Sequence, residues 1–313
     1  MRGYVATTDF SWFSFLRARQ PLDEVNFWQP SAHGFSSPPG TPFFFKLKKP
    51  HFAIAGFGLF ARYEEATPRL AWDAFKEKNG AASFDEMRAR MEAYATSANE
   101  SSHRVGCIMV SQPVFFAEGD WVEQPKDWKR NIVSGAGYDL TLGEGRRIWE
   151  ECVARAARTS QLQVADGRAV LLPTEAAPRF GAELLVRPRL GQGTFRVAVT
   201  AAYDGACAVS GEHSLPALDA AHIRPYSVEG GSHEVTNGLL LRADIHRLFD
   251  SGYVTITPEL RFVVSERLKK EWENGRAYYA LQGQVALPRN AADRPDLEAL
   301  RWHNEHVFER TAA

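Results

Sequence analysis

Apolar residues in the first half of the chain are grouped in short runs separated by polar and turn-forming residues. Five of these runs have the composition and alternation of strands, and they cover residues 2–8, 25–31, 43–49, 51–63 and 104–116. Four other stretches show helical spacing, at residues 10–19, 68–80, 83–95 and 143–157. The pattern predicts an α+β domain with a mostly antiparallel, barrel-like sheet and helices at its side.

Local signals mark several element ends in this half. Asp9 is expected to cap the helix that follows it, and Ser83 and Glu86 have the spacing of a capping box. Gly56 lies inside a predicted strand, where a glycine often marks a bulge. The aromatic segment 120–140 is predicted to be irregular.

The second half contains a strand, a loop and a helix in close succession. LDAAHIRP, residues 218–225, predicts a short strand that presents His222 at its end, and residues 227–238 form a polar, glycine-rich loop. LLLRADIHRLFD, residues 239–250, is predicted to be a helix that Gly252 ends. Its apolar positions are Leu241, Ile245, Leu248 and Phe249. The pattern then predicts a hairpin and two helices, at residues 254–265, 266–281 and 296–310.

Composition narrows the class of protein. The chain has 313 residues, of which 44% are hydrophobic and 24% charged, so it can form two domains with proper cores. The net charge is −1, so any contact with nucleic acid must come from local basic groups. The three cysteines include no CxxC pair, which predicts buried reduced thiols. No stretch has the character of a signal peptide or a membrane span, so the cytoplasm is the expected location.

Three polar side chains follow one another across the predicted strand, loop and helix. They are His222, Asn237 and His246. A neutral histidine can act as a general base near pH 7, and a second histidine can bind a metal ion. A strand and a helix that each carry one histidine can therefore hold a base and a metal ion close together.

The stretch 203–256 resembles the HNH endonucleases, the ββα-metal fold. The resemblance rests on AHIRP, NGLLL and DIHRLFD, which occur in this order. The flanking segments VRPRLGQGTFRVAV and YYAL…LRWHNEHVF are similar to those of HNH domains in restriction endonucleases. The resemblance implies that His222 is the general base, that Asn237 orients it through the loop backbone, and that His246 binds a divalent ion. Mg²⁺ or Mn²⁺ is expected, with Co²⁺, Ni²⁺ and Zn²⁺ as alternatives.

The chain departs from the commonest HNH pattern at Ala221, where many members have a second metal ligand. Two carboxylates can replace it. Asp219 precedes Ala221 by two residues and is expected on the same strand face. Asp250 follows His246 by four residues and is expected on the same helix face. We take Asp219 as the metal ligand, with Asp250 as the alternative.

Basic side chains near these residues are candidates for contact with the DNA phosphates. Arg224 follows the expected base closely, and Arg189 lies in the segment RPRLGQG, whose glycines leave backbone N–H groups open. For an arginine in such a position, a solvated surface charge is the more common role.

The first half of the chain resembles the PUA-superfamily modules, of the EVE and SRA kind. The resemblance rests on the order of elements and on VNFWQP, FFFKL and DW…NIV. Several members of that superfamily hold a flipped, modified base in an aromatic pocket. Trp28 is the expected pocket wall, because it ends a strand beside a long Gly/Pro loop; the alternative is that it fills the core.

These observations predict three segments. Residues 1–158 would be a PUA-like domain that recognises a modified base, residues 159–185 a linker, and residues 186–313 an HNH endonuclease domain. The expected function is modification-dependent hydrolysis of double-stranded DNA with a modified base, such as a modified cytosine, by a monomer or a homodimer. The alternatives are an HNH nuclease without a modification requirement, an enzyme directed at RNA, and a binding protein with an inactive HNH fold.

Overall fold

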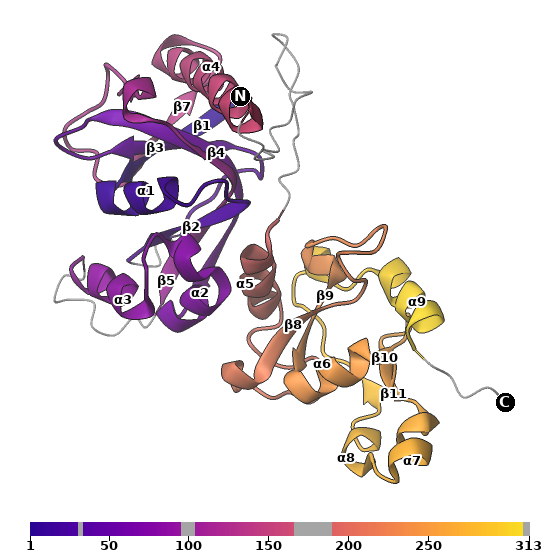
Figure 1. Ribbon diagram of the computed structural model, residues 1–313. Helices are drawn as coiled ribbons and strands as arrows, with labels where there is room; N and C mark the ends of the chain where they lie inside the picture. The colour runs from indigo at the N-terminus through magenta and orange to yellow at the C-terminus, as the bar shows by residue number, and fades with distance from the viewer. Residues whose placement is uncertain (31–33, 95–103, 166–189, 309–313) are drawn as a thin grey trace. The chain divides into compact units, whose positions relative to one another are not determined.

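The computed structural model describes residues 1–30, 34–94, 104–165 and 190–308 (Figure 1). The chain forms two compact units, Met1–Thr194 and Phe195–Ala313. Most of the predicted linker at 159–185 lies outside the described residues, and so does Arg189.

A mixed sheet is the centre of the first unit. Within the described residues its strands follow the order β2-β5-β4-β3-β1-β7, and β6 pairs with β4. All pairings are antiparallel except the one between β1 and β3. The strands are β1 (Arg2–Thr8), β2 (Glu24–Gln29), β3 (Pro42–Leu47), β4 (Ala53–Ala66), β5 (Val105–Phe115), β6 (Val122–Glu123) and β7 (Gly135–Asp139). The α+β prediction is confirmed, while the segment 120–140 contains two short strands that we did not predict.

Both faces of this sheet are covered, which explains the run of three phenylalanines in β3. Successive side chains of a strand point to opposite faces. Phe43 and Phe45 accordingly pack with Trp12 of α1 (Phe10–Arg17), while Phe44 packs with Ile148 of α4 (Gly143–Ala165). All three phenylalanines are fully buried. An unbroken apolar run is therefore what a strand between two layers requires.

The predicted caps of the first unit are only partly correct. Ser83 accepts a hydrogen bond from the backbone N–H of Glu86 at 3.2 Å, as expected at the start of α3 (Phe84–Glu92). Asp9 does not cap α1, because its carboxylate turns to Lys48 and Tyr94 instead. Asp9 therefore forms an ion pair with Lys48 and no side-chain cap of α1. The remaining helices are α2 (Pro68–Phe75), the 3₁₀ turn η1 (Lys76–Asn79), which Gly80 ends with a φ of 78°, and the 3₁₀ turn η2 (Glu118–Asp120).

The second unit is built on a two-stranded hairpin and a helix. Strands β8 (Leu218–His222) and β9 (Gly238–Arg242) pair antiparallel, and α6 (Ala243–Asp250) follows β9 directly. Helix α5 (Gln192–Ala202), whose residues from Phe195 onward belong to this unit, contributes Phe195 and Val199 to the core. A second sheet joins β10 (Val254–Ile256), β11 (Arg261–Val264) and β12 (Gly283–Gln284). The last helices are α7 (Glu266–Trp272), α8 (Arg276–Tyr279) and α9 (Leu297–His306).

Two predictions about helices in this unit are wrong. Residues 239–250 are not one helix: Leu239, Leu240 and Leu241 are buried in β9, and the helix begins at Ala243. A short apolar run fits a buried strand as well as a helix, and here the pairing with β8 decides. The helix predicted at 266–281 is interrupted at Glu273 and Gly275, which have positive φ values of 53° and 109°.

The three cysteines are buried, as predicted. Cys107, Cys152 and Cys207 are buried and free. Among the described residues, no helix has the length and apolar character needed to cross a membrane.

Candidate active site

The hairpin and helix of the second unit bring the predicted histidines to one place. His222 is the last residue of β8, opposite Gly238 at the start of β9. His246 lies in the middle of α6, which begins as soon as β9 ends. The chain thus changes directly from strand β9, which pairs with β8, to helix α6, which faces β8.

Two carboxylates flank His246. Oδ2 of Asp219 is 3.4 Å from its Nδ1, and Oδ2 of Asp250 is 3.3 Å from its Nε2. The structure therefore brings both candidate ligands to the same imidazole. Asp219 is the less exposed of the two, with 39% of its side chain accessible against 61% for Asp250.

This group has the character of a divalent cation site. Within the part of the chain that the structure describes, no lysine or arginine lies within ion-pair distance of either carboxylate. Burial raises the pKa of Asp250, and the negative charge of Asp219 raises it further, while His246 opposes them. The two carboxylates lie at different ring nitrogens of His246, so an ion bound to this imidazole would take only one of them as a partner. One imidazole and one carboxylate are nitrogen and oxygen donors that suit Mg²⁺ or Mn²⁺.

His246, Asp219 and Asp250 do not by themselves form a complete metal centre. No group of three or more His, Cys, Asp or Glu side chains among the described residues meets the geometry of a metal centre. A catalytic ion needs positions left for water and phosphate, so few protein ligands are expected.

His222 is held in the state that a general base requires. Its ring stacks on Phe195, with centroids 4.0 Å apart and planes 8° apart. Burial, followed by the charges of His233 and His246, lowers the pKa of His222 to about 4. The imidazole is therefore neutral at pH 7 and has a lone pair for a proton.

Asn237 ties the loop that links the two strands. Its Nδ2 donates to the carbonyl oxygens of Arg224 and Ser232, each at 2.9 Å, and its Oδ1 accepts from the N–H of Arg224 at 2.9 Å. The residue is 5% exposed. Only an amide both donates and accepts in this way, so the side chain fixes the backbone shortly after His222.

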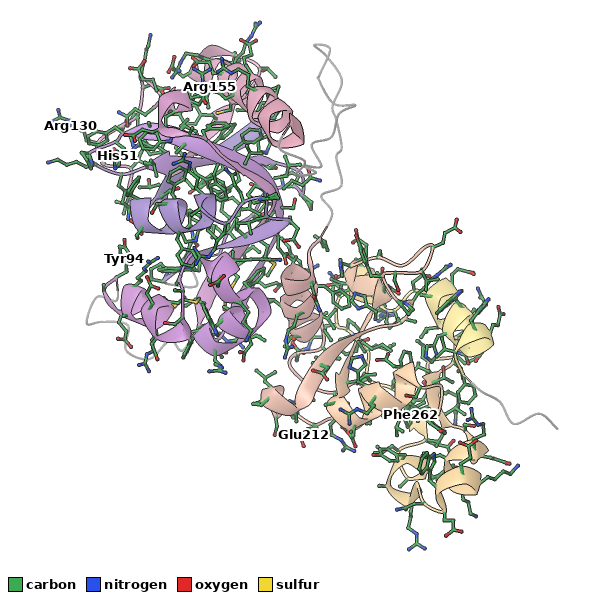
Figure 2. All side chains as sticks on the ribbon, in the orientation of Figure 1. His51, Tyr94, Arg130, Arg155, Glu212 and Phe262 are labelled. Atoms are coloured by element: carbon green, nitrogen blue, oxygen red, sulfur yellow. The ribbon has the colours of Figure 1, made fainter. Side chains whose placement is uncertain are left out.

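A second candidate site lies in the first unit. A cavity of about 900 Å³ is lined on one side by aromatic residues that include Trp28 and Tyr94 (Tyr94 is labelled in Figure 2). Trp28 is half-buried, its Nε1 donates to the carbonyl oxygen of Asn79 at 3.0 Å, and its ring lies 6.5 Å from that of Tyr94. Trp28 thus borders a cavity.

Charged groups form another part of the same lining. The ammonium of Lys48 is 2.6 Å from Asp9, and the hydroxyl of Tyr94 donates to the other oxygen of Asp9 at 2.6 Å. Burial lowers the pKa of Lys48, but Asp9 and Tyr94 together outweigh it, so the pKa is raised and the side chain stays charged. The cavity therefore offers an acceptor and a cationic donor side by side.

The register of the parallel pair explains how Asp9 and Lys48 meet. Strands β1 and β3 run parallel with Thr8 opposite Leu47, so the next residues, Asp9 and Lys48, lie at the same edge of the sheet. This pair was not predicted from the sequence. Asp9 directly follows one predicted strand, and Lys48 lies near the end of another. The sequence does not show that these two strands, β1 and β3, pair with each other.

Comparison with known families identifies the site of the second unit. Residues 207–257 match the family model described as HNH endonuclease. The second unit contains an HNH endonuclease domain. This domain is a phosphodiester hydrolase, and HNH nucleases generally use a divalent metal ion, which agrees with the group around His246.

Three solved structures are similar to this chain, with low sequence identities and low TM-scores. ASCH from Zymomonas mobilis and a mutant of it are 12% and 11% identical and cover 47% of this chain, 94% and 96% of their own chains, with TM-scores of 0.29 and 0.33. A structure described as "Modification dependent TagI restriction endonuclease" is 14% identical and covers 98% of this chain and 82% of its own, with a TM-score of 0.29. No curated protein matches the sequence.

Arg224 lies at the entrance of the loop in the HNH domain. Its guanidinium carbon is 5.1 Å from the centre of the Trp302 ring, and a Cβ at Gly230 would meet the guanidinium. Its backbone is held by Asn237. The side chain is therefore confined between Trp302 and Gly230, while its predicted contact with a DNA phosphate stays a prediction.

Two side chains contact His222 that the sequence did not predict as its neighbours. Phe195 supports the ring of His222, and the Nδ1 of His233 is 2.9 Å from the Nε2 of His222. His233 is half-buried, although it lies in a polar loop. Its position four residues before Asn237 was a usable signal, since Asn237 fixes the same loop.

Proposed function

We propose that this protein is a modification-dependent DNA endonuclease, in which the first unit binds an altered base, such as a modified cytosine, and the HNH domain hydrolyses a phosphodiester bond. The nuclease activity is supported by one arrangement on the hairpin and helix of the second unit. There a neutral His222 lies on the strand, and two carboxylates without a lysine or arginine partner among the described residues flank His246 on the helix. Base recognition is supported by the aromatic and charged lining of the cavity in the first unit.

The residues of the HNH domain divide the chemistry of hydrolysis. His222 takes a proton from water, the resulting hydroxide attacks phosphorus, and the bond to the leaving sugar oxygen breaks. His246 with Asp219 or Asp250 would hold a divalent ion, which neutralises charge on the phosphate and on the leaving oxygen. Asn237 holds the backbone shortly after His222, and Arg224 would contact the phosphate.

The cavity of the first unit offers what an extruded base needs. A base outside the helix is held by stacking on an aromatic ring and by hydrogen bonds to its edge. Trp28 would provide the stacking surface. Asp9 would accept from an exocyclic amino group such as N4 of cytosine, and Lys48 would donate to the neighbouring ring acceptor.

The test is cleavage of matched phage DNAs in Mg²⁺ and in Mn²⁺. The DNAs are unmodified or carry 5-methylcytosine, 5-hydroxymethylcytosine or its glucosylated form. Cleavage of one modified DNA alone is the expected result. Equal cleavage of all four would keep the nuclease and remove the base-recognition proposal.

His222→Ala is the variant that tests the proposed base. We expect it to abolish cleavage and to leave DNA binding intact. Binding without any cleavage by the wild-type protein would instead favour an inactive HNH fold, for which the fully buried Ala221 is the relevant observation.

The number of DNA strands that are cut follows from the number of HNH domains. One domain cuts one strand, so a double-strand break requires a homodimer or two successive nicks. Nicked and linear plasmid are separated on a gel, and the dependence of linear product on protein concentration distinguishes the two routes.

A further inference from the structure

Two imidazoles face each other in the HNH domain. His233, in the loop between β8 and β9, has its Nδ1 2.9 Å from the Nε2 of His222, and the ring centroids are 5.0 Å apart with a tilt of 60°. This is hydrogen-bonding distance between two nitrogens. A bond forms only if one nitrogen carries a hydrogen and the other a lone pair.

Packing fixes each ring from behind. Phe195 stacks on His222 at 4.0 Å, and Tyr226 stacks on His233 at 4.1 Å with planes 13° apart. Phe195 is 1% exposed, so the support of His222 is part of the core, whereas Tyr226 is 55% exposed and forms an outer support. The mutual orientation of the two imidazoles is therefore set by their neighbours.

The loop backbone fixes the pair a second time. Asn237 bonds to Arg224, shortly after His222, and to Ser232, directly before His233. A Cβ at Gly231 would lie 2.0 Å from the carbonyl oxygen of Pro225, so the loop also needs a glycine there. One amide thus places both histidines, which a role limited to His222 would not require.

We propose that His233 is a positioning residue for hydrolysis: its Nδ1–H donates to Nε2 of His222 and selects the tautomer in which that nitrogen keeps its lone pair. The proposal rests on the proposed function, because it takes His222 as the base. His222 then carries its own hydrogen on Nδ1. The attacking water displaces the donor from the lone pair and transfers its proton to the same nitrogen.

The groups around His222 define what loss of His233 would change. Phe195 on α5 presents a hydrocarbon face, so the titratable neighbours are His233 in the loop and His246 on α6. A donor on Nε2 opposes protonation of that nitrogen, and so does a nearby positive charge. Without His233, protonation of His222 becomes easier and the base is lost at a higher pH.

Two substitutions separate the hydrogen bond from the packing. His233→Phe keeps a ring against Tyr226 and removes the N–H, whereas His233→Asn gives up the ring and keeps an amide N–H near the position of Nδ1. The exposed neighbour Glu234→Gln is the matched control. All are compared on a plasmid or DNA that the wild-type protein cuts.

We expect His233→Phe to lower kcat by about 10–100-fold, as loss of an orienting partner does, without a change in DNA affinity. The acid limb of its kcat/KM profile should move to higher pH. His233→Asn should recover most of the rate, and Glu234→Gln should match the wild type. A direct readout is the ¹H–¹⁵N spectrum of His222, which should report Nδ1–H in the wild-type protein and a mixture of tautomers in His233→Phe.

Failures of the two proposals are distinguishable. If His222→Ala still cuts, the assignment of the base is wrong. If His222→Ala is inactive while His233→Phe keeps the wild-type rate, pH profile and tautomer, only the role of His233 is overturned. Equal losses of rate in the Phe and Asn variants with an unmoved acid limb would also overturn it, since they would indicate a packing role alone.

Discussion

The carboxylate of Asp219, on β8, lies 3.4 Å from the Nδ1 of His246, on α6. Ala221, the position at which the commonest HNH pattern has a second metal ligand, is fully buried and carries no donor atom in its side chain. Asp219, two residues earlier on the same strand, is therefore the ligand that we propose in its place.

Asp219→Asn should weaken metal-dependent cleavage more than Asp250→Asn does. Asp219 is the less exposed carboxylate, and a bound metal ion contributes several kcal/mol to the stabilisation of transition-state charge. We expect a loss of roughly 100-fold or more for Asp219→Asn, corresponding to about 3 kcal/mol. Cleavage rate as a function of Mn²⁺ concentration measures it, with Asp204→Asn as a remote control. The opposite ranking would assign the ligand to Asp250.

Asn237→Asp should damage both the fold and the activity. The carboxylate keeps the size of the amide but cannot donate to Arg224 and Ser232, so two partly buried carbonyl groups lose their partner. The expected decrease in the free energy of unfolding is roughly 1–3 kcal/mol, and cleavage should fall about 10–100-fold. Denaturant unfolding and plasmid nicking measure the two effects. Wild-type activity in this variant would contradict the loop-fixing role.

Trp28→Ala should remove the preference for modified DNA while nicking activity remains. Stacking of a base on an aromatic ring contributes about 1–3 kcal/mol, so the discrimination should fall by about tenfold or more. Competition binding with modified and unmodified duplexes measures it. The exposed Trp272→Ala in the second unit is the matched control. A preference unchanged in Trp28→Ala would place base recognition elsewhere.

His303 makes the stability of the second unit depend on pH. Its Nε2 is 3.1 Å from the carbonyl oxygen of Phe249, and its Nδ1 is 2.9 Å from the hydroxyl of Thr255. A carbonyl oxygen only accepts, so Nε2 carries the hydrogen and Nδ1 accepts from Thr255. Burial lowers the pKa of His303 from 6.5 to about 4, against the opposing effect of the Phe249 carbonyl.

The sign of this effect follows from proton binding. Between about pH 6.5 and pH 4 the unfolded chain binds a proton that the folded chain does not. The free energy of unfolding should therefore fall as the pH drops through this window, by on the order of 3 kcal/mol for His303 alone. Denaturant unfolding at pH 7.5 and pH 4.5 checks the wild-type protein. In His303→Gln the dependence should be smaller, and a dependence of unchanged size would assign it to other groups.

The sequence by itself determined the features that local chemistry controls. Strand-like composition located the main strands of the first unit, and the order of His222, Asn237 and His246 predicted the HNH domain that the family match confirms. Glycine also marked a helix end correctly, since Gly252, which follows α6, has a positive φ of 73°. These signals depend on neighbours in sequence, so no knowledge of the fold was needed.

The tertiary structure decided which distant groups meet. Leu239–Leu241 became a strand because β8 provides a partner, although the run alone fits a helix equally well. Asp9 left its expected cap because the parallel register places it beside Lys48. His233 acquired a partner because Asn237 folds the loop back onto β8. Each outcome depends on pairing across a long separation, whose register and geometry the one-dimensional pattern does not contain.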